Sequence, residues 1–222
     1  MSGWLNFILA FVAFFAAHMI PTRPKLRDGL IRSLGRGGFL LTYSALSVVL
    51  LAWVILAAGT APFVPLWDWQ PWLRHVPQIG MLAACLLVAV SVGRVNPFSF
   101  GGSAGTFDPA QAGWLRLTRH PLLLALALWA FTHLVPNGDL AHVLMFGIFG
   151  GFALLGMVML DRRNRRRLGQ AEWQARQQAL RVAPLNLSGI LGPRPLLRLG
   201  AGVLVYVLLL LLHGPVIGVV PY

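Results

Sequence analysis

The chain has 222 residues, of which 57% are hydrophobic and only 11% are charged, and its formal net charge is +12. A soluble domain of this length cannot bury so much apolar surface, so the composition indicates an integral membrane protein. The basic residues are confined to segments between apolar runs, where anionic lipid headgroups attract them, so no nucleic-acid partner is expected.

Seventeen of the eighteen Lys and Arg residues occur in the three segments 23–36, 94–119 and 162–198. Long uncharged runs separate these segments, which is the positive-inside pattern of a polytopic membrane protein. The pattern places the three segments in the cytoplasm and both chain termini outside it.

Six apolar runs are candidates for membrane spans, since a helix needs about 20 residues to cross the hydrocarbon. They are 3–20, 38–60, 77–93, 121–136, 140–160 and 197–219. The fourth run is short, about 24 Å at roughly 1.5 Å per residue, and can end inside the bilayer. We therefore predict an all-α bundle of about six transmembrane helices in a single domain, 1–222, with the first run retained rather than cleaved as a signal.

The connecting segments differ in character. The outer loop 61–76 carries three tryptophans among prolines, which favours an interfacial lid. The cytoplasmic segment 94–119 contains Asn-Pro and Gly-Gly pairs and is predicted to have little regular structure. Segment 161–182 has Trp173 and Leu180 seven residues apart, which predicts an amphipathic helix along the inner membrane surface.

Acidic residues are absent from the interior of every apolar run, since Asp139 and Asp161 lie only at run ends. Paired-carboxylate acid–base chemistry and carboxylate-bound metals are therefore not expected in the membrane. The single cysteine, Cys85, excludes an intrachain disulfide and a cysteine-based zinc site.

Histidine is the ionisable residue that the apolar runs do contain. Five of the six histidines lie in these runs or at their ends: His18, His120, His133, His142 and His213. An intramembrane ionisable side chain is a functional candidate by default, although each histidine can also simply bond a backbone carbonyl. Imidazoles without carboxylates or paired thiolates suit the axial positions of a buried haem better than zinc or calcium.

A second candidate is the tripeptide Arg119-His120-Pro121, where a basic segment meets the fourth apolar run. Proline in the first helical turn is structurally ordinary. Arg and His beside a helix N-terminus can also hold an anionic group at the membrane surface. Both interpretations stay open on the sequence.

Several short motifs in order resemble the NnrU family of bacterial membrane proteins over essentially the whole chain. They are His18 with Ile20-Pro21, Arg23 with Leu26-Arg27, Leu34-Gly35, Tyr43, Arg119-His120-Pro121, Trp129, His133, Asn137-Gly138-Asp139, and Leu212-His213 with Gly218 and Pro221. The resemblance implies a multi-pass protein of the bacterial inner membrane, linked to denitrification through nitrite and nitric oxide metabolism.

The NnrU family is also similar to 15-cis-zeta-carotene isomerase, a membrane enzyme that uses haem b to isomerise a polyene double bond. That similarity implies haem iron held by His18 and His133, the latter in a Trp-x-x-x-His stretch. The isomerase has a cysteine after this tryptophan, whereas this chain has Ala130, which argues against a ligand-switching mechanism but not against haem. An apolar polyene or a lipid is the substrate that this similarity implies.

Depth along the predicted spans suggests other ligand pairs. His133 lies near the outer turn and His18 much deeper, so two other pairs are open: His133 with His142, which His213 could join, and His18 with His120. We rank His18 with His133 first, because that match is residue by residue.

A wider resemblance connects Arg119-His120-Pro121 with isoprenylcysteine and phospholipid methyltransferases, where this element and a downstream acidic pair hold S-adenosylmethionine. Here the downstream residues are Asp161-Arg162-Arg163, so the acidic pair is absent. The leading hypothesis is therefore a haem b protein with cofactor-binding residues His18, His133, Arg119 and His120. The alternatives are a methyltransferase and a non-enzymatic assembly partner of a membrane reductase, so whether the chain is an enzyme stays open.

Overall fold

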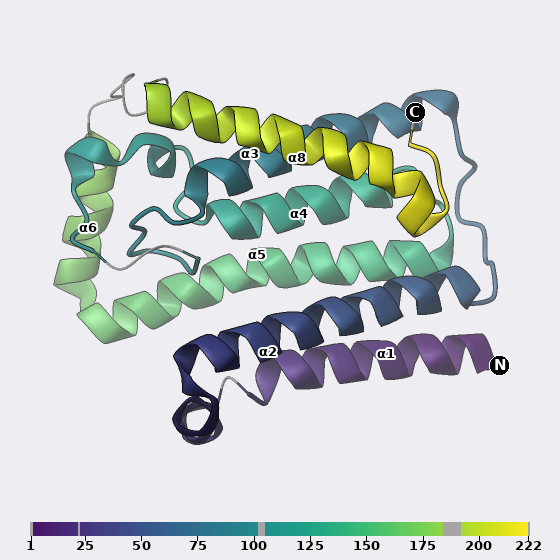
Figure 1. Cartoon of the computed structure of the whole chain (residues 1–222), viewed down its shortest axis with the longest axis horizontal. Helices are drawn as coiled ribbons and strands as arrows, with labels where there is room; N and C mark the ends of the chain where they lie inside the picture. The colour runs from purple at the N-terminus through teal and green to yellow at the C-terminus, as the bar shows by residue number, and fades with distance from the viewer. Residues whose placement is uncertain (1, 22, 102–104, 184–191, 222) are drawn as a thin grey trace. The chain divides into compact units, whose positions relative to one another are not determined.

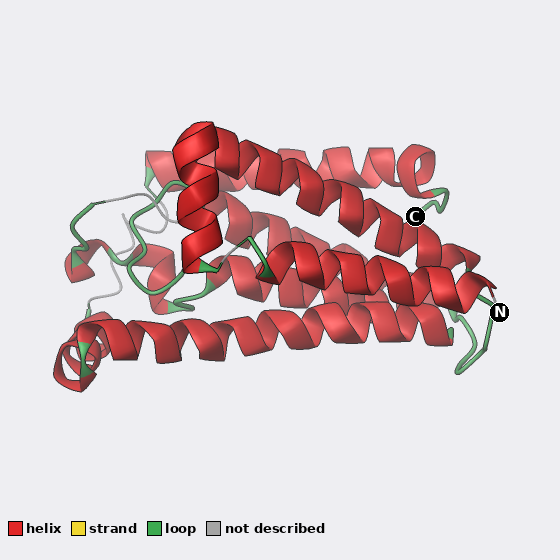
Figure 2. Cartoon of the chain, turned by 90° about the horizontal axis from the view of Figure 1, so that it is seen from below, coloured by secondary structure: helices red, strands yellow, loops and turns green. Residues whose placement is uncertain are grey.

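The computed structural model describes residues 2–21, 23–101, 105–183 and 192–221, and within these ranges the regular structure is entirely helical (Figure 2). The helices, marked in Figure 1, are α1 (Ser2–Met19), α2 (Pro24–Thr60), α3 (His75–Ser91), α4 (Pro121–Leu134), α5 (Leu140–Leu168), α6 (Gln170–Val182) and α8 (Pro193–Ile217). Short 3₁₀ turns occur at Pro71–Arg74, Pro109–Gln111 and Gly113–Arg116. The all-α prediction is confirmed.

Five of these helical segments are long and apolar enough to cross a membrane: α1, α2, Pro71–Ser91, α5 and α8. The remaining apolar helix, α4, has 14 residues and is too short to cross the hydrocarbon unaided. The chain is therefore a polytopic membrane protein, and its fourth apolar run is short, as predicted.

Two predicted segments differ in extent from the helices of the structure. α2 begins at Pro24, ahead of the apolar run predicted at 38–60, and Gly35, which has φ 70° and ψ 166°, divides a basic first part of α2 from that run. α5 continues past residue 160 to Leu168, so the helix predicted for 161–182 is two helices, separated by Gly169 at φ 83°. Arginine and leucine are good helix formers, so charge alone does not end a helix, whereas a glycine with positive φ does.

The chain forms two compact units. The first comprises Met1–Asp68 and Gly138–Met145, and the second comprises Trp69–Asn137 and Phe146–Tyr222. Helix α5 begins in the first unit and continues in the second. The single domain spanning 1–222 stays a prediction.

In the first unit, α1 and α2 form an antiparallel hairpin (Figure 1). The start of α1 meets the end of α2, where Trp53 Nε1 donates to Asn6 Oδ1 at 3.1 Å. Phe7, Phe11 and Phe14 are spaced four and three residues apart, so they share the buried face of α1. The hairpin is thus held by an aromatic seam and one polar contact.

In the second unit, α3 packs against both α4 and α8. Small residues allow these close approaches, as is usual between membrane helices. A Cβ at Gly80 would lie 2.6 Å from Thr132 Oγ1, and one at Gly202 would lie 3.1 Å from the Cys85 carbonyl oxygen. Helix α5 packs on α4 through a separate small cluster, Leu123, Ala127 and Ala153.

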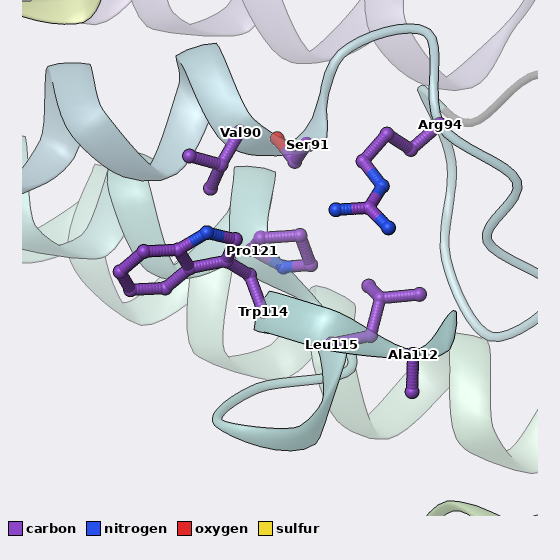
Figure 3. Close-up of a pocket in the computed structure, with 7 residues that line it drawn as sticks. All are labelled: Val90, Ser91, Arg94, Ala112, Trp114, Leu115 and Pro121. Atoms are coloured by element: carbon purple, nitrogen blue, oxygen red, sulfur yellow. The ribbon is translucent and has the colours of Figure 1, made fainter. Parts of the chain in front are cut away.

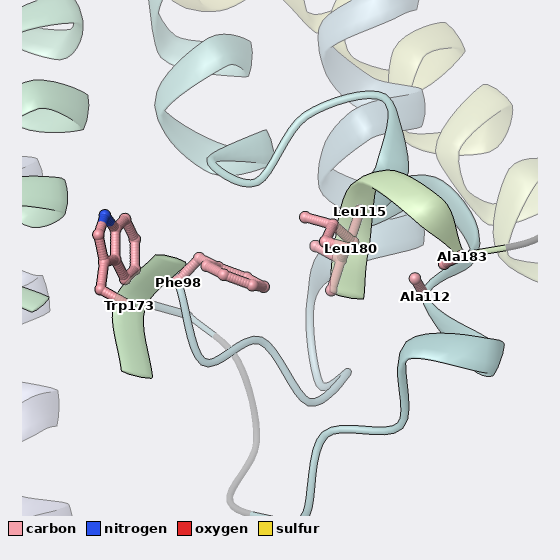
Figure 4. Close-up of a cluster of buried hydrophobic side chains, with 6 residues drawn as sticks. All are labelled: Phe98, Ala112, Leu115, Trp173, Leu180 and Ala183. Carbon is pink, nitrogen blue, oxygen red and sulfur yellow. The ribbon is translucent and has the colours of Figure 1, made fainter. Parts of the chain in front are cut away.

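The apolar face predicted for the 161–182 segment is real, and the chain itself covers it. Trp173 and Leu180 of α6 pack with four buried residues of the neighbouring segments, shown in Figure 4: Phe98, Ala112, Leu115 and Ala183. The buried Asn164 amide donates to the Phe98 carbonyl at 2.8 Å. This hydrogen bond holds the segment around Phe98, which has no regular helix to satisfy its backbone groups. This face is therefore part of the protein core.

Candidate functional site

The candidate residues of the second unit lie at the two ends of α4. His120 is the residue before the helix and His133 is close to its end. Thirteen residues separate them, which is roughly 20 Å at about 1.5 Å per residue. One ligand of haem size therefore cannot be bound directly by both, and the two ends are separate candidate sites.

At the start of α4, Arg119, His120 and Asp161 form a hydrogen-bonded group that we name the polar cluster. Arg119 Nε lies 3.1 Å from each oxygen of the Asp161 carboxylate, and a terminal guanidinium nitrogen also donates to Oδ2. His120 Nε2 lies 2.9 Å from Asp161 Oδ1. Arginine presents a planar fork of donors that matches a carboxylate, so Asp161 is held from two directions.

The His120 imidazole is 4% exposed, and burial lowers its pKa below the ordinary value, against the opposing hydrogen bond and charge of Asp161 and with a smaller contribution from Arg119. The neutral ring donates from Nε2 to the carboxylate, so its Nδ1 carries the lone pair. Within the described residues that Nδ1 is buried without a hydrogen-bond partner. Neutral histidine therefore satisfies Asp161 at one nitrogen and leaves one buried acceptor.

Pro121, the residue that follows His120, lines a small pocket together with residues of α3 and of the segment before α4, and Figure 3 shows the lining side chains. Arg94 and Trp114 approach it from opposite sides (Figure 3). Burial, followed by the charge of Arg198, lowers the pKa of the Arg94 guanidinium. Arg198 itself donates to the Val92 carbonyl at 2.6 Å, so this positive charge also caps the end of α3.

At the other end of α4, His133 and His213 of α8 form what we name the histidine pair. Their ring centroids are 6.5 Å apart and the ring planes differ by 20°. His133 Nδ1 lies 2.8 Å from the Trp129 carbonyl oxygen, and His213 Nδ1 lies 2.7 Å from the Val219 carbonyl oxygen. A carbonyl only accepts, so each ring donates from Nδ1.

Local backbone geometry explains the bond that His213 makes. Gly218 ends α8 in the left-handed region, at φ 86°, which turns the chain back so that the Val219 carbonyl reaches His213. Gln78 of α3 donates to the Pro221 carbonyl at 2.6 Å and so holds the turned-back segment. The segment that follows Gly218 therefore supplies the carbonyl to which His213 Nδ1 donates.

His133 sits among aromatic rings. Its centroid is 6.1 Å from the Trp129 ring and 5.5 Å from Phe146. These contacts and the Trp129 carbonyl fix the orientation of the imidazole. A neutral, oriented imidazole with an unprotonated Nε2 is the form that ligates a metal.

The remaining candidate histidines lie in the first unit. His18 Nδ1 lies 2.9 Å from the Phe14 carbonyl oxygen, and its ring stacks on Phe14 at 4.1 Å. His142 Nδ1 lies 2.7 Å from Asp139, whose other oxygen accepts from the His142 backbone N–H and caps α5. His18 and His133 belong to different units, so their pairing stays a prediction.

Asp161 is a candidate site residue that the sequence pattern alone does not single out. It accepts hydrogen bonds from Arg119 and His120, which lie 42 and 41 residues before it. The available signal is its position between the fifth apolar run and the following arginines. Within the described part of the chain, no group of three or more His, Cys, Asp or Glu side chains could hold a bare metal ion.

Comparison with known proteins adds one finding. The family described as NnrU protein matches residues 6–221, nearly the whole chain. No curated protein and no solved structure matches the chain. The matched range contains α1 from its second turn, all later helices and both ends of α4 with their candidate residues. On this match the chain belongs to the NnrU family.

Proposed function

We propose that this NnrU protein is a haem b-binding protein of the bacterial inner membrane. The observation that carries the proposal is the chemistry of His133, a half-buried imidazole whose Nδ1 is fixed on the Trp129 carbonyl. Anchoring one ring nitrogen on a backbone carbonyl sets the tautomer and makes the other nitrogen a better metal ligand. The donor set around it contains imidazoles and no thiolates, which fits haem iron.

The surroundings of His133 also suit an apolar macrocycle. Trp129, Phe146 and Phe149 form an aromatic wall in which Trp129 lies 5.5 Å from Phe146 and 5.8 Å from Phe149. Aromatic walls exclude water, and a dry, low-dielectric site sets the reduction potential of bound iron. When bound, the haem would supply a redox-active Lewis-acidic iron.

Two roles fit such a protein. One is redox-linked isomerisation of a polyene such as zeta-carotene, which would approach from the lipid because the outer surfaces of α4 and α8 are apolar. The other is a haem-dependent step linked to nitrite or nitric oxide in denitrification, alone or with a membrane reductase as partner. Family membership supports both, and the apolar lipid-facing surface favours a lipid-soluble substrate.

We further propose the inner-membrane topology predicted by charge. The Arg-rich ends of α5 and α8, and the basic first turns of α2, would lie in the cytoplasm, with both termini outside. The histidine pair, near the opposite ends of α4 and α8, would then lie toward the outer side. Cysteine-accessibility labelling of loop 61–68 in intact cells tests this orientation.

The experiment that tests the proposal is the absorption spectrum of detergent-purified protein expressed with haem precursor. We expect a Soret band and, after pyridine extraction, haem b at about one equivalent per chain. Protein that folds and purifies but has no Soret band, before or after addition of haemin, would refute the proposal.

A second candidate function is methyl transfer at the polar cluster, and one observation favours it. Asp161 supplies one carboxylate to Arg119 and His120, and Pro121, the next residue in sequence, lines a small pocket with Arg94 and Trp114. However, Arg119 already bonds Asp161 at three nitrogen-to-oxygen contacts, so a cofactor carboxylate would have to compete for it. Calorimetry with S-adenosylmethionine decides: micromolar binding supports methyl transfer, and absence of heat removes it.

A further inference from the structure

We propose that the end of α3 and the start of α8 bind the phosphate of an anionic phospholipid, between Arg94 and Arg198 and beside the indole N–H of Trp114. All three residues belong to the second unit. The site is independent of the proposed haem function and lies where apolar helices meet two of the basic segments.

Two guanidinium groups from distant parts of the sequence meet at the end of α3. Arg198 Nη1 lies 2.6 Å from the Val92 carbonyl oxygen and 3.4 Å from that of Ala89, so this side chain crosses from α8 to α3. A Cβ added at Gly93 would lie 4.0 Å from Arg198 Nη2, which places the charge beside the backbone that leads into Arg94. Burial, and then the charge of Arg198, lowers the pKa of the Arg94 guanidinium, as expected for two cations held close together.

Among the described residues, no carboxylate neutralises Arg198. All six acidic residues lie in the described part of the chain, and none of them forms an ion pair with Arg198. The helix end that it bonds carries only about half a negative charge, so the two cations leave an excess positive charge. Close cations repel each other at the edge of a low-dielectric membrane, and a bound anion would offset this repulsion.

A buried donor lies at the same pocket. Trp114 Nε1 is buried and has no hydrogen-bond partner within the described residues. Trp114 and Arg94 line the small pocket from opposite sides, and the Arg94 guanidinium points into the space between them (Figure 3). The pocket has room for a group about the size of one water molecule, which matches a single phosphate oxygen. An indole N–H only donates, and an anionic oxygen is a strong acceptor for it.

Apolar surface around the arginines favours a lipid over a soluble phosphate. Val88 and Val92, four residues apart at the end of α3, are 40% and 50% exposed. Val205 lies seven residues after Arg198, on the same side of α8, and is 48% exposed. These side chains can pack against acyl chains, while basic groups between membrane helices hold the head group.

The test measures lipid binding to the full-length protein in detergent by native mass spectrometry, with dioleoylphosphatidylglycerol as the probe. We expect one tightly bound lipid per chain, and weaker binding of dioleoylphosphatidylcholine, whose choline cation would face the two arginines. Arg94→Gln and Arg198→Gln should each weaken binding about ten-fold, because each removes a charge-assisted hydrogen bond. Trp114→Phe keeps an aromatic ring but removes the donor, and should weaken binding about three-fold.

The matched control is Arg194→Gln, which removes an exposed charge from the first turn of α8 and should change binding by less than about two-fold. Equal weakening in the control and in the site variants would mean that general surface charge attracts the lipid, and would overturn the proposal. Equal affinity for the two lipids would overturn the preference for an anionic one.

A further arm separates a lipid from a soluble phosphate. If inorganic phosphate at millimolar concentration raised the unfolding temperature as much as phosphatidylglycerol does, the site would belong to a soluble phosphate and the lipid assignment would be wrong. Arg198 also caps α3, so its variant counts only if it elutes as the wild type does. Arg94→Gln and Trp114→Phe decide the test otherwise, and unchanged lipid binding in both would overturn the proposal.

Discussion

The two ends of α4 satisfy their polar groups in opposite ways. At the polar cluster, side chains satisfy one another: Asp161 accepts from Arg119 and from His120. At the histidine pair, each ring donates one hydrogen bond to a backbone carbonyl, and no carboxylate among the described residues bonds to either ring. Titratable groups at the two ends of the same helix can therefore have different roles. The histidine pair, in which the described residues leave one nitrogen of each ring without a hydrogen bond, is the better candidate for binding a ligand.

The largest expected difference between the ends is in haem content. His133→Ala should abolish or strongly reduce haem absorption, because it would remove an axial ligand of the proposed haem. His120→Ala should leave the spectrum unchanged, because His120 is roughly 20 Å away along α4. Haem per chain, from pyridine extraction and protein assay, measures both. Equal loss in the two variants would mean that the ends are not separate sites.

For stability, we expect the larger effect from a substitution in the polar cluster. Asp161→Asn removes the charge that pairs with Arg119 and accepts from His120, and should lower the free energy of unfolding by about 2–3 kcal/mol, between the values for exposed and buried ion pairs. The side chains of Arg119 and Asp161 are 39% and 22% exposed. Thermal unfolding in detergent measures the loss, and haem content per folded chain should not change.

A matched control tests whether the loss of stability comes from the hydrogen bonds of Asp161 or from the removal of a negative charge as such. Glu172→Gln breaks the exposed pair with Arg176, one turn along α6, and should change stability by less than about 0.5 kcal/mol. Losses of equal size in Asp161→Asn and Glu172→Gln would show that Asp161 contributes no more than a surface charge.

Residue periodicity and charge were enough to predict the helical class, the short α4 and the apolar face formed by Trp173 and Leu180, but not that other segments of the chain cover this face. These depend on local pattern, which a sequence displays directly. The single helix predicted for 161–182 was wrong, because charged residues prolong α5 to Leu168 and Gly169, with positive φ, separates α5 from α6. The contacts of Asp161 with Arg119 and of His213 with His133 join residues 42 and 80 positions apart, and no local pattern encodes such a pairing.

The helix contact beside His133 offers a further comparison, because it depends on the close packing of α3 against α4 and not on charged side chains. Gly80→Ala would place a Cβ 2.6 Å from Thr132 Oγ1, next to His133, so α3 and α4 would have to separate. Overpacking of this kind should lower stability by about 1–3 kcal/mol. Thermal unfolding measures the loss, and adding Thr132→Ala should recover most of it.

The control for this substitution lies on α8. Gly200 has no atom within 4 Å of the position of an added Cβ. Gly200→Ala should therefore be neutral or stabilise the helix by up to about 1 kcal/mol, through helix propensity alone. If Gly80→Ala were as well tolerated as Gly200→Ala, the close approach of α3 to α4 would be wrong.

The smallest expected effect is the pH dependence of the polar cluster. Burial lowers the pKa of His120 in the folded protein, so the folded state takes up a proton less readily than the unfolded chain, whose histidine titrates near about 6.5. The contribution of His120 to stability is therefore complete above the pKa of the unfolded chain and is lost as the pH falls from there toward the lowered folded pKa.

The variant His120→Gln keeps a donor for Asp161 but cannot titrate. The unfolding free energy of wild type minus that of His120→Gln should decrease between about pH 8 and pH 5.5, with Asp161, Arg119 and the other histidines common to both proteins. A difference that stays constant would mean that folding does not lower the pKa of His120. A difference that increases toward acid pH would mean that Asp161 holds His120 protonated, and its Nδ1 would then be a donor rather than an acceptor.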